Sequence, residues 1–334
     1  MTLKSKLLGA VASAAMLTGS GAFAAGHGGE ITVAYFLEWP MPFQFAKETG
    51  MYDEAMGGTK INWVSFDTGT AMSAAMASGD VQISVSQGVP PFVVAASAGQ
   101  DIQIVDVAVS YSENDNCVVQ AALEIDKESA SELAGKKVAV PLGTAAHYGF
   151  LSQMSHFGVD PASMEIVDMA PAEGAAALAQ GALDMACGWG GALRRMKEHG
   201  NVLLTGAEKE ALGILVFDVT SAPAAFIAEE SELLTQFLSV TASANAMWAD
   251  EANHAKMLPV IAKDAGMSEE DTMATISTFT FPTVEDQLSG AWLGGNAQSF
   301  MQGVAGVFVD AGSIPSALDS YDGTVNTDAL AATQ

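Results

Sequence analysis

The stretch INWVSFDTGTAMSAAMASGDVQISV, residues 61–85, contains one complete strand, helix, strand unit. Ile61–Phe66 is rich in β-branched and aromatic residues, which predicts a strand, and the turn Asp67-Thr68-Gly69 leads into a predicted helix over Thr70–Ala77. Ser78-Gly79-Asp80 ends that helix before a second apolar run, Val81–Val85. Because a right-handed crossover places such strands side by side, the unit predicts a parallel sheet covered by helices.

The same alternation continues on both sides of this unit. Helices are predicted over residues 43–51 and from Pro90 onward, and further strands at 31–36, 102–109, 117–121, 137–140, 165–169, 185–188 and 214–219. The polar segment 112–116 separates the two series of strands, and 334 residues are enough for two cores. We therefore expect an α/β protein with a ligand cleft between two lobes. Lobe 1 comprises residues 25–115 and 216–334, and lobe 2 comprises residues 116–215.

The N-terminus has the pattern of a cleavable export signal. Lys4 and Lys6 precede an apolar run at residues 7–17 that is too short for a transmembrane helix, and Ala22-Phe23-Ala24 fits the small-x-small cleavage pattern. We interpret residues 1–24 as a signal peptide that is cut near Ala24/Ala25. The mature protein is expected in the periplasm.

The composition restricts the partners of the mature protein. Hydrophobic residues make up 49% and charged residues 16% of the chain, which is typical of a folded protein, and the formal net charge is -26. Such a surface repels the phosphates of nucleic acids and also repels free anions. A small zwitterion is repelled far less, so it is compatible with this charge.

Sequence motifs for catalysis are missing. The chain has no GxxxxGK, no GxGxxG after a strand and no HExxH, so we expect no enzyme, no cofactor and no metal ion. The two cysteines, Cys117 and Cys187, both fall in predicted strands of lobe 2. A disulfide and a pair of buried thiols both remain open.

Three turns from a strand into a helix are candidates for binding an anionic group. They are residues 67–70, 86–90 and 141–144, and each combines unpaired backbone N–H groups with the positive end of a helix dipole. The three oxygens of a sulfonate suit such donors. Candidate residues for this end of a ligand are Thr68, Gln87, Gly88, Thr144 and His147.

The ammonium of a zwitterion needs acidic or aromatic partners. Glu38 and Trp39 follow the first strand, and Trp189 ends a glycine-rich segment where its ring can lie against a cation. Asp218 lies within an otherwise apolar strand, where an unpaired carboxylate is unfavourable. With Asp115, these residues are our candidates for the cationic end.

Several segments, in order along the chain, resemble the periplasmic binding proteins of ABC importers for taurine, nitrate and sulfonates, and those for taurine in particular. The resemblance is carried by Ile31–Tyr35, Phe66–Gly69, Ala77–Ile83, Lys136–Pro141, Thr144 with His147-Tyr148, Glu165–Val167, the Trp189 region and Leu215–Val219. It implies a two-lobed type II fold that closes over its ligand, with helix N-termini holding the sulfonate and an acid holding the ammonium. By position, it implies that Gln87, Gly88, His147, Trp189 and Asp218 line the site.

The sequence thus predicts a monomeric solute-binding protein that delivers taurine to an ABC permease in the inner membrane. One alternative is a binding protein for another small sulfonate or amine-bearing anion, and another is a binding protein that serves a membrane sensor. An enzyme similar to the pyrimidine synthases of thiamine biosynthesis is the alternative of a different class. Their cysteine-rich motif has no counterpart in this sequence.

Overall fold

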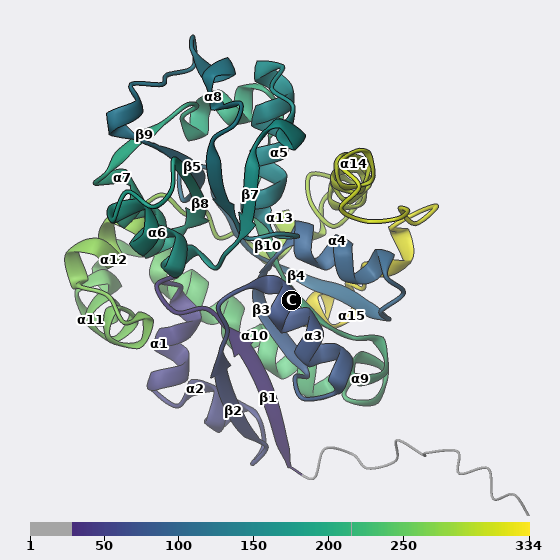
Figure 1. Ribbon diagram of the computed structural model, residues 1–334. Helices are drawn as coiled ribbons and strands as arrows, with labels where there is room; N and C mark the ends of the chain where they lie inside the picture. Colours follow the sequence, from purple (N-terminus) through teal and green to yellow (C-terminus); the bar gives the residue numbers. More distant parts are fainter. Residues whose placement is uncertain (1–28, 215) are drawn as a thin grey trace, which may run out of the picture.

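The structure is a computed structural model that describes residues 29–214 and 216–334. The predicted signal peptide, residues 1–24, lies outside the described residues. Two five-stranded sheets, each flanked by helices, lie one above the other in Figure 1. The α/β class predicted from the sequence is confirmed.

The first sheet has the order β2-β1-β3-β10-β4. Its strands are β1 (Glu30–Tyr35), β2 (Lys60–Ser65), β3 (Ile83–Gly88), β4 (Ile102–Ser110) and β10 (Phe217–Pro223). β1 pairs in parallel with β2 and β3. Every residue of β3 is buried, as expected of a central strand covered on both faces.

The second sheet has the order β7-β6-β8-β5-β9. Its strands are β5 (Asp115–Gln120), β6 (Lys137–Val140), β7 (Glu165–Asp168), β8 (Met185–Trp189) and β9 (Gly200–Val202). β6 pairs in parallel with β7 and β8. The short strand β9 was not predicted from the sequence.

The expectation of purely parallel sheets is wrong in both sheets. β10 runs antiparallel to β3 and β4, and β5 runs antiparallel to β8 and β9. The reason is the path of the chain between the sheets. β4 leads toward the second sheet and β10 returns from it, so β10 enters the first sheet in the opposite direction. Each sheet is therefore mixed. β4 is followed directly by β5 of the second sheet, and β10 follows the last strand of that sheet, so the chain passes twice between the two sheets.

Helices follow the strands in the predicted alternation. Those of the first two-thirds of the chain are α1 (Pro42–Glu48), α2 (Met51–Ala55), α3 (Gly69–Ser78), α4 (Val89–Ser97), α5 (Ala145–Phe157), α6 (Pro171–Ala179), α7 (Gly190–Lys197) and α8 (Gly206–Ala211). The helix predicted over 43–51 is divided into α1 and α2. Gly50 lies between them with a φ of 78°, a left-handed conformation that suits glycine.

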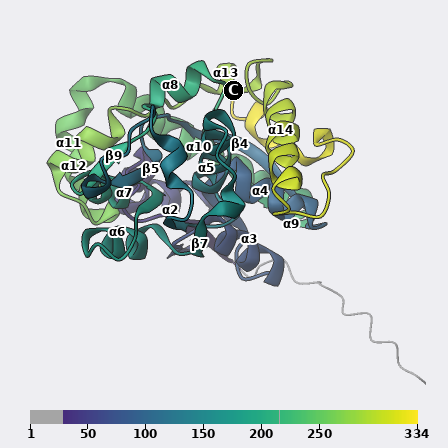
Figure 2. The ribbon, with the colours of Figure 1, turned by 45° about the horizontal axis from the view of Figure 1, so that its top comes forward.

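The C-terminal third of the chain is helical. It contains α9 (Ala224–Glu229), α10 (Ser231–Ala249), α11 (His254–Ala265), α12 (Glu269–Ile276), α13 (Val284–Leu288), α14 (Asn296–Asp310) and α15 (Asp328–Ala331). α10 and α11 pack on α1, whereas α14 lies along α4 and α5, as Figure 2 shows. Within residues 29–214 and 216–334, no helix has the length and apolar character to span a bilayer.

Cys117 and Cys187 form a disulfide, which settles the alternative that the sequence left open. The two residues face each other on the antiparallel strands β5 and β8. The bridge joins positions 70 residues apart, and closing a loop of this length stabilises the fold by about 4 kcal/mol on the chain-entropy model. It ties together the two strands whose ends carry Asp115 and Trp189.

The first sheet takes its strands from residues 30–110 and 217–223, and the second from residues 115–202. This distribution is compatible with the expected lobes. The exact boundaries, 25–115 with 216–334 and 116–215, remain a prediction.

Candidate ligand-binding site

A small cavity lies where the ends of the two sheets meet. The space between its lining side chains is about 290 Å³, including its opening. It is lined by residues at the ends of β3 and β8, at the starts of β5 and β10, and at the starts of helices. This is the edge at which open α/β sheets bind ligands.

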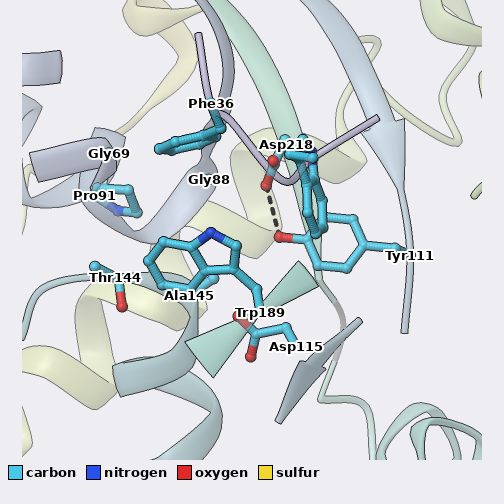
Figure 3. Close-up of a pocket in the computed structure, with 11 residues that line it drawn as sticks. Phe36, Gly69, Gly88, Pro91, Tyr111, Asp115, Thr144, Ala145, Trp189 and Asp218 are labelled. Atoms are coloured by element: carbon cyan, nitrogen blue, oxygen red, sulfur yellow. Dashed lines mark hydrogen bonds between the residues drawn. The ribbon is translucent and has the colours of Figure 1, made fainter. Parts of the chain in front are cut away.

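Three helices begin at one end of the cavity. Gly69 opens α3, Gly88 precedes α4, and Thr144 and Ala145 begin α5, and all four line the cavity together with Pro91. The first amides of a helix have no intrahelical acceptor, and the helix dipole adds positive potential there. At α4 this applies only to the first residue, Val89, because Pro90 and Pro91 have no backbone N–H. In Figure 3, Pro91 and Thr144 lie on the side of the Trp189 ring opposite Tyr111. This end of the cavity is suited to an anionic group.

Asp218 also lines the cavity and is 2% exposed, and it lies beside Gly88, where an added Cβ atom would be 3.5 Å from Asp218 Oδ1. The hydroxyl of Tyr111 donates a hydrogen bond to Asp218 Oδ1 at 2.7 Å, drawn as the dashed line in Figure 3, and Ser86 Oγ donates to Asp218 Oδ2 at 2.7 Å. Trp39 Nε1 in turn donates to Ser86 Oγ at 2.9 Å. Burial, and secondarily the charge of Asp115, raises the pKa of Asp218 to about 7.

The position of Ser86 depends on an uncommon backbone conformation. Its φ is 60°, in the left-handed region that residues other than glycine rarely adopt. The conformation is held by the hydrogen bonds of the Ser86 hydroxyl to Trp39 and Asp218. Such backbone strain is found preferentially at functional sites.

A second acid, Asp115, lines the same cavity and is 1% exposed. Its Oδ2 atom has no hydrogen-bond partner among the described residues. Lys209 is also 1% exposed, and its Nζ donates to the main-chain oxygen of Asp115. Burial raises the pKa of Asp115 to about 7, although the charge of Lys209 acts in the opposite direction. A buried acceptor without a donor indicates a place for a cationic or donor group.

Four aromatic residues complete the wall: Phe36, Trp39, Tyr111 and Trp189. Trp39 and Tyr111 pack edge to face with ring centroids 4.8 Å apart, and Phe36 and Trp189 lie 6.0 Å apart. Phe36 follows β1 of the first sheet, whereas Trp189 ends β8 of the second. The second aromatic pair therefore spans the gap between the sheets.

The structure brings six of the residues predicted for the site to this cavity: Trp39, Gly88, Asp115, Thr144, Trp189 and Asp218. The side chains of the other four contact other parts of the protein. Thr68 Oγ1 caps α3 by accepting from the amide of Ala71, and Gln87 Nε2 donates to the main-chain oxygen of Gly69. These two side chains therefore support the helix start that borders the cavity.

His147 and Glu38 also lie outside the cavity lining. His147 Nδ1 accepts from the amide of Gly143 at 3.1 Å, and its ring stacks on Phe308. Burial lowers the pKa of His147 to about 4, so the ring is neutral at pH 7. Glu38 forms a bidentate ion pair with Arg195, with distances of 2.7 and 3.0 Å.

Five lining residues were not among the predicted site residues: Phe36, Gly69, Pro91, Tyr111 and Ala145. Phe36 and Tyr111 directly follow the strands β1 and β4, and Gly69, Pro91 and Ala145 are the first to third residues of helices. Their positions at element ends were readable from the sequence. No local feature distinguished them from the other residues that end an element.

Within residues 29–214 and 216–334, no three His, Cys, Asp or Glu side chains are grouped so that they could hold a metal ion. The polar groups that line the cavity are instead helix starts and two buried acids. This combination fits a small molecule that carries both a negative and a positive group.

The chain is similar in sequence to known proteins and similar in fold to solved structures. The chain is 26% identical over 298 residues to the taurine-binding periplasmic protein of Escherichia coli K12, covering 87% of this chain and 89% of that protein. Its fold is similar to that of the alkanesulfonate-binding protein SsuA from Xanthomonas axonopodis pv. citri bound to MOPS. That likeness has a TM-score of 0.73 at 18% identity and covers 91% of this chain and 100% of the other.

The desulfurization enzyme DSZB is also similar in fold, with a TM-score of 0.61 at 14% identity, covering 91% of this chain and 98% of that one. Identities this low show a shared fold only. Residues 41–255 match the family described as NMT1/THI5 like, and they make up more than half of the chain. The protein belongs to the NMT1/THI5-like family.

Proposed function

We propose that this protein is the periplasmic solute-binding component of an ABC importer and that it captures taurine or a closely related small aminosulfonate. In this proposal the protein is exported, acts as a monomer, binds its ligand without chemical change and delivers it to a permease. The taurine-binding relative from Escherichia coli and the sulfonate-binding structural neighbour support the ligand class.

The observation that carries the proposal is the combination of opposite charge preferences within one cavity. The starts of three helices line this cavity, and the buried carboxyl groups of Asp115 and Asp218 line it as well. Backbone amides at helix starts favour a sulfonate, whereas the acids favour an ammonium. A ligand with only one of these charged groups leaves either the helix amides or the acids without a partner of opposite charge.

We infer the roles of the remaining candidate residues from their contacts. Thr144 and Gly88 border the sulfonate, and Trp39 and Trp189 cover the ligand with their rings. Thr68, Gln87 and His147 hold the loops that border the sulfonate, through the amide of Ala71, the carbonyl of Gly69 and the amide of Gly143. Glu38 joins the segment after β1 to α7 through Arg195.

Isothermal titration of the purified, ligand-stripped protein with taurine, ethanesulfonate and ethylamine tests the proposal. The first compound has both charged groups and each of the others has one. Taurine is expected to bind at least about 100-fold more tightly than either half-ligand. Equal affinities for taurine and ethanesulfonate would remove the ammonium subsite, and no binding of any of the three would refute the proposed ligand class.

The enzymatic alternative is favoured only by the likeness to DSZB. Incubation with taurine, followed by analysis for sulfite and for unchanged taurine, distinguishes the two functions. Quantitative recovery of taurine is expected. Loss of radiolabelled taurine uptake in a deletion strain would test delivery to the importer.

A further inference from the structure

The cationic end of the cavity is built mainly from aromatic rings. Phe36, Trp39, Tyr111 and Trp189 all line it, and Figure 3 shows Phe36, Tyr111 and Trp189 arranged around the space that Asp218 borders. Three of these residues belong to the first sheet or its loops, and Trp189 ends a strand of the second. Aromatic faces attract cations, and sets of such rings are the usual means of recognising methylated ammonium groups.

Protein donors already occupy part of the hydrogen-bonding capacity of the acids in the cavity. A primary ammonium has three N–H donors, whereas a trimethylammonium has none. Each oxygen of Asp218 accepts one hydrogen bond within the protein, from Tyr111 or from Ser86, and keeps one lone pair for a further donor. Asp115, the other acid that lines the cavity, has a buried Oδ2 atom that accepts no hydrogen bond from the described residues.

The charges at this end nevertheless require a cation. Asp115 and Asp218 supply two negative charges when ionised, and the buried Lys209, which binds the main-chain oxygen of Asp115, supplies one positive charge. The sum is one negative charge, which a single ligand cation neutralises. Burial raises the pKa of both acids, and a cation placed beside them would lower it.

From the four rings that line the cavity and the single net charge, we propose that the cationic subsite accepts a methylated ammonium. The preferred ligands are then N-methylated aminosulfonates, from N-methyltaurine to N,N,N-trimethyltaurine, in preference to taurine itself. The inference rests on the proposed function, because the sulfonate end is shared by all these compounds.

Titration calorimetry with taurine and its mono-, di- and trimethylated forms tests the inference. At least one methylated form is expected to bind at least about tenfold more tightly than taurine. If taurine binds within tenfold of every methylated form, or more tightly, the inference is overturned while the proposed function stands. If none of the four binds, both fail.

Substitutions of the aromatic residues that line the cavity test whether their rings cause the higher affinity for methylated forms. Trp189→Leu is expected to lower the affinity for the tightest methylated form at least about tenfold and to lower that for taurine less. Phe36→Leu is a second test in case the first variant folds poorly. Trp292→Leu is the matched control, since Trp292 packs on Phe217 outside the cavity, 5.3 Å between centroids, and no change in affinity is expected. Equal losses for taurine and the methylated form in both wall variants would contradict the assignment.

Discussion

Gly88 is the point at which strand β3 becomes helix α4, and it borders the cavity. Its φ of -57° is accessible to any residue. A Cβ atom added here would lie 3.5 Å from Asp218 Oδ1 and 3.5 Å from the Cβ of Ala145. These are ordinary van der Waals distances, so the methyl group would occupy ligand space without displacing the backbone.

We therefore predict that Gly88→Ala folds normally and loses at least about tenfold in ligand affinity. Calorimetry gives the affinity, and chemical unfolding gives the stability, which is expected to change by less than about 1 kcal/mol. Gly303→Ala, in the middle of α14 with open space around the added methyl, is the control that should keep full affinity. Unchanged affinity of Gly88→Ala would place the ligand elsewhere.

Asp218 accepts a hydrogen bond at each of its two carboxyl oxygens. Tyr111 and Ser86 both donate to it, and Asp218→Asn would keep its size while removing the negative charge. We expect this variant to lose at least about 100-fold in affinity for taurine and less than about tenfold for ethanesulfonate, because ethanesulfonate lacks the ammonium. The ratio of the two dissociation constants is the quantity to measure. A ratio unchanged from wild type would exclude Asp218 from the cationic subsite.

At the scale of elements, the start of α7 contacts the segment after β1. The amide of Gly191 donates to the main-chain oxygen of Glu38, and the Glu38 carboxylate pairs with Arg195. A Cβ at Gly191 would approach Glu38 Oε2 to 2.8 Å, so glycine permits this close packing. These contacts join the two sheets beside the cavity.

We predict that Arg195→Gln weakens ligand binding by about two- to fivefold. The effect is small because both side chains are more than one-third exposed, and such ion pairs contribute about 1 kcal/mol or less. The comparison is best made by calorimetry at low and high salt, where the difference between variant and wild type should shrink as salt rises. Lys127→Gln breaks an exposed pair with Glu208 away from the cavity and should have no effect. An effect of equal size in both variants would show that general charge, not this contact, is responsible.

At the scale of the whole molecule, the two buried acids couple stability to pH and to ligand. Their pKa values rise from 3.8 to about 7 on folding, so between about pH 4 and pH 7 the folded protein holds protons that the unfolded chain releases. The free energy of unfolding of the ligand-free protein therefore falls as pH rises through this range. A bound cation favours the ionised acids and opposes this loss.

Scanning calorimetry checks this prediction. The Tm of the ligand-free protein should fall by at least about 4 °C between about pH 5 and pH 8, and less when the protein is saturated with ligand. Ligand affinity should rise over the same interval. The double variant Asp115→Asn, Asp218→Asn controls for the other 37 acidic residues among the 39 Asp and Glu, and its Tm should depend less on pH. An identical pH dependence in this variant would assign the effect to other groups, among them the buried Asp106, whose pKa burial also raises.

The sequence alone determined the alternation of strands and helices, the three strand-to-helix turns and the residues Gly88 and Thr144 at those turns. These features depend on side-chain periodicity and on turn residues, which act over a few neighbouring positions. The burial of Asp218 in an apolar strand was likewise readable, because its neighbours along the strand are apolar.

The tertiary structure alone decided which side chains meet. It placed β10 antiparallel between β3 and β4, which brings Asp218 opposite Gly88, and it paired Phe36 with Trp189 from different sheets. It also directed Glu38 to the side chain of Arg195 and Gln87 to the main-chain oxygen of Gly69. Those two partners come within reach only when separate segments pack, and no local pattern encodes them. Thr68 and His147 instead accept from the amides of Ala71 and Gly143, three and four residues away, so their contacts are local.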